Sequence, residues 1–149
     1  MPQKASSWYI AATHYLTTAL IGGILSRIIM IGIFVLLPEL HSAIESLALL
    51  VVSTFSVGLA VWYSSAKVLK KKYTVKEKDR IIKLSTIYFI VLGLLALILY
   101  IFKGAFSTSS EVEIITFIFR TINLIVLLVV FRWGSKKFIK VEVDKNREV

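Results

Sequence analysis

Four long apolar runs dominate this sequence of 149 residues, and each is long enough to cross a lipid bilayer as one helix. A hydrocarbon core of ~30 Å requires about 18 or more apolar residues with few charges. A soluble domain can bury a core without such runs, and the hydrophobic content of 57% exceeds that of ordinary soluble domains. The sequence therefore predicts an all-α, four-helix integral membrane bundle. The expected spans are residues 16–37, 43–65, 81–102 and 112–133.

Residues 1–149 are expected to form a single four-span transmembrane domain whose first span is a retained signal anchor. Ahead of that span, Trp8 and Tyr15 bracket a less apolar stretch. Aromatic rings with a polar tip favour the head-group region, so residues 1–15 are interpreted as an N-terminal interfacial segment. This segment is predicted to be either a short amphipathic helix or a protruding first turn.

Short turns are expected to join the first span to the second and the third to the fourth. Pro38 is expected to end the first span, because proline cannot continue a helix without losing a hydrogen bond. Ser42 with Glu45, and Ser110 with Glu113, have the spacing of a capping box, in which each side chain satisfies a free backbone N–H. Helices are therefore predicted to begin at Ser42 and Ser110.

Residues 134–149 form a charged tail in which polar and apolar residues alternate between Lys140 and Asp144. Alternation of this kind is typical of a half-buried strand, which would have to pair with residues 73–75. A strand of this length is unstable alone. Disorder of the tail is therefore the simpler expectation.

The chain carries 18 basic and 9 acidic residues, a formal net charge of +9. Such an excess can indicate nucleic-acid binding, but the basic residues gather beside apolar spans, at 66–80 and 134–149. Basic residues in short loops are retained in the cytoplasm. We therefore expect a multi-pass protein of the cell membrane with a basic cytoplasmic loop, cytoplasmic termini and no nucleic-acid partner. Anionic lipid head groups are expected to contact Lys70, Lys71 and Lys72.

Polar residues inside the fourth span form the strongest pattern in the chain. Glu113, Thr116, Arg120 and Asn123 follow each other at intervals of three or four, which places them on one helix face. Charged residues at mid-bilayer usually face the protein interior. Together with Arg27 of the first span, they are predicted to form an intramembrane polar cluster that is either structural or a site for an anionic ligand.

Small residues in the first span predict close packing of helices. Ala19 and Gly23, and likewise Gly22 and Ser26, lie four residues apart, a spacing that lets two membrane helices approach each other closely. They share a face with Arg27. We therefore predict that the first helix packs against the fourth through Gly23, Arg27, Arg120 and Asn123.

Residues suited to catalysis or metal binding are sparse. The chain has no cysteine, and neither His14 nor His41 has a second ligand at metal-binding spacing. We expect His14 to lie at the membrane interface, hydrogen-bonded to head groups or backbone. Ser53 and Ser56 are interpreted as packing positions, because a serine nucleophile needs a nearby base. No catalytic residue, metal or cofactor is expected.

The sequence favours a non-enzymatic protein that serves as an accessory, assembly or structural subunit. Its partners would be other membrane proteins or copies of itself, and membrane lipids, especially anionic ones. The alternative is an oligomeric transporter or channel for an anionic or lipid-like substrate. Coupled cation transport is disfavoured, since it usually requires a carboxylate deep in the membrane.

Overall fold

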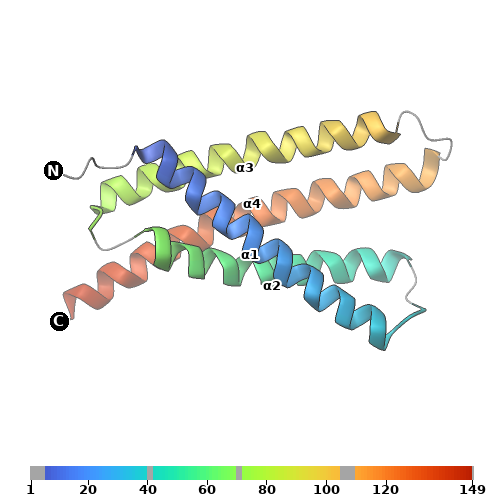
Figure 1. Cartoon of the computed structure of the whole chain (residues 1–149), viewed down its shortest axis with the longest axis horizontal. Coiled ribbons are helices and arrows are strands. Elements are labelled where there is room, and N and C mark those ends of the chain that lie inside the picture. Colours follow the sequence, from blue (N-terminus) through green and yellow to red (C-terminus); the bar gives the residue numbers. More distant parts are fainter. Residues whose placement is uncertain (1–5, 40–41, 70–71, 105–109, 149) are drawn as a thin grey trace.

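The chain forms four long helices, described by a computed structural model for residues 6–39, 42–69, 72–104 and 110–148. They are α1 (Ser7–Leu36), α2 (Ser42–Val68), α3 (Val75–Gly104) and α4 (Ser110–Arg147) (Figure 1). Each helix is long and apolar enough to span a membrane, and the described residues contain no strand. The expected all-α, four-span architecture is confirmed, and the chain is a multi-pass helical membrane protein.

The helices extend beyond the expected spans. Residues 7–15 form the first turns of α1 rather than a separate amphipathic helix. Much of segment 66–80 is also helical, because α2 continues to Val68 and α3 begins at Val75.

The charged tail is a continuation of α4, so the expectations of disorder and of a strand at 140–144 were both wrong. The reason is tertiary packing. Ile139 is buried beside Ile82 of α3, and Lys78 of α3 forms a largely buried ion pair with Glu142. Ile139 and Glu142 therefore lie on one face of the helical tail, and this face packs against the rest of the bundle.

The starts of the helices follow capping chemistry. α2 and α4 begin at Ser42 and Ser110, as predicted, although the side chains of these serines lie outside the described residues. The start of α3 carries a capping box that sequence reasoning missed. The backbone N–H of Thr74 donates to the Glu77 carboxylate at 2.8 Å, and the N–H of Glu77 donates to Oγ1 of Thr74 at 3.3 Å.

The bundle has two chemically different ends. We call the end where α1 and α3 begin and α2 and α4 finish the basic end, and the other the opposite end. α1 crosses the other helices diagonally (Figure 1) and packs against α2 and α3, while α4 also packs against α2 and α3. α1 and α4 are therefore diagonal partners, so the predicted packing of the first helix against the fourth was wrong.

The core lies toward the basic end. One buried cluster there contains Ile10, Ala11, Leu69, Ile81, Ile82 and Ile139, and a second contains Val57, Val61 and Phe131. Toward the opposite end, large apolar side chains are exposed on every helix, including Ile28, Leu49, Leu99 and Ile118. Apolar side chains on this half are suited to contact with lipid or with other membrane helices.

Candidate functional site

A buried histidine joins three helices in the basic half of the bundle. Nδ1 of His14 on α1 lies 2.7 Å from Oγ of Ser64 on α2, and Nε2 lies 3.0 Å from Oγ of Ser135 on α4. All three side chains are fully buried. We call these residues the His14 junction.

The hydrogen bonds of the His14 junction fix the directions of its protons. The hydroxyl of Ser64 donates to the backbone oxygen of His14 at 3.0 Å. Because a serine has a single hydroxyl proton, Ser64 must accept the bond from Nδ1–H. Nε2 of a neutral imidazole can then accept from the hydroxyl of Ser135. Both ring nitrogens are satisfied without any charge.

The His14 junction has part of the geometry of a nucleophile and its base, because Ser64 lies within hydrogen-bond reach of an imidazole. It lacks the rest. The second ring nitrogen faces Ser135 rather than a carboxylate, and the ring packs at 5.1 Å between centroids against Phe131. A fully buried serine and histidine offer no substrate access, so the junction acts as a structural link between helices.

The partners of His14 differ from the expected head groups or backbone, because its ring is buried and bonded to two serine side chains. The sequence contained a signal that would have placed it correctly. His14, Thr18, Gly22, Ser26 and Met30 repeat every four residues, and all five are buried. His14 therefore belongs to the same helix face as the small residues that pack against α2.

The small residues of α1 separate into two groups. Gly22 is buried against α2, where an added Cβ would lie 3.0 Å from Cγ2 of Val57, and Ser26 is buried on the same face. Ala19 and Gly23 are exposed, and an added Cβ at Gly23 would meet nothing within 4 Å. One of the two predicted small-residue pairs thus packs inside the bundle, and the other faces outward.

The polar residues of α4 face α2 and α3 rather than α1. Oδ1 of Asn123 accepts a hydrogen bond from Ser53 of α2 at 2.9 Å. The guanidinium of Arg120 lies 4.3 Å from the ring centroid of Tyr100 on α3. Glu113 belongs to α4, but its side chain lies outside the described residues.

Arg27 does not join this group. Its side chain is exposed on α1, among exposed apolar residues that include Ile24 and Ile28. The structure therefore divides the predicted polar cluster between two separate parts of the bundle. The expectation that both arginines face inward was wrong, because α1 turns its Gly22 face, and not its Arg27 face, toward the neighbouring helices.

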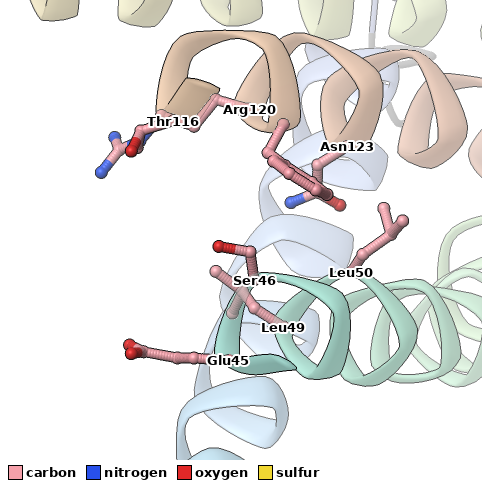
Figure 2. Close-up of a pocket in the computed structure, with 8 residues that line it drawn as sticks. Glu45, Ser46, Leu49, Leu50, Thr116, Arg120 and Asn123 are labelled. Carbon is pink, nitrogen blue, oxygen red and sulfur yellow. The ribbon is translucent and has the colours of Figure 1, made fainter. Parts of the chain in front are cut away.

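A cavity of about 270 Å³ lies between α2 and α4 near the opposite end. Figure 2 shows its lining, with Glu45 and Arg120 extending from different helices toward the same end of the bundle. Thr116 and Asn123 also line it, so three of the four predicted polar positions of α4 meet there. The complete lining is Glu45, Ser46, Leu49, Leu50, Thr116, Phe119, Arg120 and Asn123.

The lysines expected to contact anionic lipid are only partly described. Lys72 is exposed at the basic end, with its ammonium 5.2 Å from the ring centroid of Tyr73. Lys70 and Lys71 lie outside the described residues.

Comparisons with known proteins do not assign the chain to a family. No family model matches it, and neither curated proteins nor solved structures contain a match. Within the described ranges, no group of three or more histidine, cysteine, aspartate or glutamate side chains could hold a metal ion.

Proposed function

We propose that this chain is a non-enzymatic accessory or assembly subunit of the cell membrane that binds another membrane protein through one face of α1. The face consists of Ala19, Gly23 and Arg27, and we call it the α1 docking face. The observation that carries the proposal is the exposure of Arg27 midway along a membrane-spanning helix.

Arg27 is costly to leave in contact with lipid. It lies ten residues before Leu37, or about 15 Å along a helix, which is half of a ~30 Å hydrocarbon core. A charged residue at that depth costs roughly 2.5–3.5 kcal/mol on insertion scales. Arg27 has no hydrogen bond, ion pair or ring contact with a side chain that the structure describes. A partner that supplies a carboxylate would offset this cost.

The neighbours of Arg27 suit a closely packed partner helix. Ala19 and Gly23 precede it at four-residue intervals and are exposed, and the space outside Gly23 is open. Small residues at this spacing let two membrane helices approach closely enough for extensive van der Waals contact. The α1 docking face therefore combines a site for close approach with one unpaired charge.

The charge favours a different protein over a second copy of this chain. In a symmetric dimer through this face, Arg27 would lie near its own copy and repel it. The acidic residues of this chain sit close to helix ends, as Glu45 and Glu113 do, each at the fourth residue of its helix. The partner we propose is thus a membrane helix with an Asp or Glu at the depth of Arg27.

The orientation we propose places both termini in the cytoplasm. The basic end carries the lysine-rich segment 66–80 and the charged end of α4, whereas the opposite end has one lysine or arginine beside its turns, Lys103 in the last turn of α3. Positive charge beside spans favours the cytoplasmic side. An even number of spans places both ends of the chain on that side.

The arrangement supports an accessory role over an oligomeric transporter. A polar path would require the charged and polar residues to share a face, but Arg27 lies on α1 away from Arg120 and Asn123. Asn123 is also bonded to Ser53 within the bundle. Among the described residues, Arg27 is therefore separate from the polar group between α2 and α4, and the two do not form one polar face for several copies to enclose.

The proposal can be tested by photocrosslinking from the α1 docking face in native membranes. A photoreactive residue at Ala19 should capture one membrane protein, and the crosslink should map to a membrane helix that contains Asp or Glu. Arg27→Gln should abolish capture, while Arg27→Lys should retain it. Charge exchange between Arg27 and the partner carboxylate should restore capture.

Gly23→Leu and Gly32→Leu form a matched pair of a test variant and its control. Both glycines are exposed on α1 and have open space where a side chain would start, but they lie on opposite flanks of the helix. We expect Gly23→Leu to abolish capture and Gly32→Leu to leave it unchanged. Equal capture by all variants, or crosslinks only to lipid or to copies of this chain, would contradict the proposal.

A further inference from the structure

The cavity between α2 and α4 carries opposite charges that do not neutralise each other. Glu45 and Arg120 both line it, yet they form no ion pair with one another. Figure 2 shows the two side chains on facing helices, both extending toward the opposite end of the bundle. A carboxylate and a guanidinium held apart at one cavity can bind a ligand that carries both an anion and a cation.

The Arg120 guanidinium is held in place from a third helix. It lies 4.3 Å from the ring centroid of Tyr100, well within the roughly 6 Å range of a cation–π contact. Tyr100 in turn stacks on Phe117 at 6.3 Å, with the planes only 13° apart. Arg120 makes no hydrogen bond or ion pair with a side chain that the structure describes, so its N–H groups are available for bidentate binding of a phosphate.

Asn123 supplies a second donor at the inner end of the cavity. Its Oδ1 is engaged by the hydroxyl of Ser53. Its amide nitrogen has no partner among the side chains that the structure describes. In Figure 2 this nitrogen lies on the side of the amide that faces Arg120 and Glu45. An amide N–H can donate to a phosphate oxygen but cannot bind an ammonium group.

The remaining lining limits the size and nature of the ligand. Leu49, Leu50 and Phe119 give the cavity apolar walls. Its volume of about 270 Å³ lies just below the usual range of roughly 300–1,000 Å³ for sites that enclose a whole ligand. The cavity therefore suits a polar head group, with any attached apolar chain remaining outside.

We infer that this cavity is a binding site for the head group of an aminophospholipid, a phosphate joined to a primary ammonium. The phosphate binds the guanidinium of Arg120 and the amide N–H of Asn123, and the ammonium binds the carboxylate of Glu45. The exposed apolar side chains of the neighbouring helices accommodate the acyl chains. This site is separate from the α1 docking face and does not depend on it.

The test uses the full chain, purified and examined by native mass spectrometry with added phosphatidylethanolamine or phosphatidylglycerol. We expect phosphatidylethanolamine adducts to form preferentially. Arg120→Gln should weaken them by about tenfold or more, the usual scale for hydrogen bonds to charged groups. Glu45→Gln should remove the preference between the two lipids without abolishing binding.

Two control substitutions show whether a change in lipid binding comes from the cavity or from the loss of any charge. Arg27→Gln removes the other mid-span arginine, and Glu39→Gln removes an exposed acid near the same end. Both should leave adduct formation unchanged. Equal losses from Arg27→Gln and Arg120→Gln would overturn the proposal, as would a preference for phosphatidylglycerol in the unaltered chain.

Soluble competitors distinguish the recognised group from the lipid that carries it. Phosphoethanolamine should displace bound phosphatidylethanolamine, and inorganic phosphate at the same concentration should not. Displacement by phosphate alone would show that Glu45 plays no part and would overturn the inference. If Arg120→Gln does not fold, thermal unfolding of the unaltered chain and of Glu45→Gln with each lipid provides the same comparison. Phosphatidylethanolamine should then raise the Tm of the unaltered chain more than phosphatidylglycerol does, and equal shifts would overturn the inference.

Discussion

Nε2 of His14 lies 3.0 Å from Oγ of Ser135, although 121 positions separate the two residues in the chain. This contact is a direct side-chain link between α1 and α4, which otherwise face each other across the bundle diagonal. Along α4, Ser135 lies between Phe131 of one buried apolar cluster and Ile139 of the other. Its contribution to stability can be measured by deleting hydroxyl groups one at a time.

The first prediction is that Ser135→Ala destabilises the bundle by about 1 kcal/mol. The substitution leaves a buried ring nitrogen of His14 without a partner, and such bonds contribute on this scale in membrane proteins. Ser56→Ala is the control, because the hydroxyl of Ser56 is fully buried but has no hydrogen-bond partner among the described residues. It should be neutral or stabilising. Thermal unfolding in detergent distinguishes the two, and equal Tm values would contradict the assignment.

The second prediction concerns two adjacent glycines of α1. Gly→Ala raises helix propensity by a similar amount at either position, so the difference between the variants isolates packing. At Gly22 the new methyl would meet Val57 at 3.0 Å from Cγ2 and 3.3 Å from Cα, whereas Gly23 opens onto free space. Gly22→Ala should therefore be less stable than Gly23→Ala by about 1–3 kcal/mol. Unfolding in detergent measures this difference, and a Gly23→Ala variant that is the less stable would contradict the packing of α1.

Much of the fold could be predicted because bilayer-spanning helices are determined by local sequence. Length and hydropathy located all four helices without any knowledge of their contacts. The serines at positions 42 and 110 also marked helix starts correctly. The helical tail could not be predicted this way, because the contacts that Ile139 and Glu142 make with distant residues such as Lys78 are not visible in the local sequence.

The candidate site was harder to predict, because the side chains that a residue contacts depend on how the helices cross each other. The sequence placed Gly22 and Gly23 one residue apart, but only Gly22 meets another helix. Arg27 and Arg120 both lie inside apolar runs of the sequence. In the structure, however, Arg120 contacts Tyr100 on α3, whereas Arg27 has no side-chain partner among the described residues. Nothing in the residue types reveals that α1 and α4 are diagonal rather than adjacent.

The third prediction tests the ion pair that holds the end of α4. Side chains of Lys78 and Glu142 are only 6% and 16% exposed, so Glu142→Leu should destabilise the protein by about 3 kcal/mol through the buried charge it leaves. Adding Lys78→Met should recover most of the loss. Hydrogen exchange across residues 134–147 and thermal unfolding provide the readouts.

A surface pair offers the control for this prediction. Lys83 lies 2.9 Å from Asp79, but their side chains are 62% and 42% exposed. Lys83→Met should therefore change stability little, because solvent screens exposed pairs. A double variant of Lys78 and Glu142 that remains as unstable as Glu142→Leu would show that the pair does not hold the tail.

The fourth prediction concerns anionic lipid at the basic end. Each lysine near an anionic surface contributes on the order of 1 kcal/mol, or about fivefold in affinity. Replacing Lys70, Lys71 and Lys72 with glutamine should reduce the excess of anionic over zwitterionic lipid that co-purifies with the full chain. The difference should shrink at high salt because ions screen exposed charges. An unchanged lipid ratio at low salt would exclude a role for these three residues.

The last prediction is the orientation of the bundle. Reporters fused after Val149 and inserted near Ser107 should be active on opposite sides of the membrane, with the Val149 reporter active in the cytoplasm. The reason is that Lys and Arg gather beside the ends of α2 and α4, while the turn near Ser107 has one basic neighbour, Lys103. Shifting positive charge from one side of the membrane to the other tests whether the lysines determine this orientation. Adding lysines near Ser107 while replacing those at 70–72 with glutamine should weaken or invert the orientation. A Val149 reporter active only outside the cell would instead require an inverted bundle or an odd number of spans.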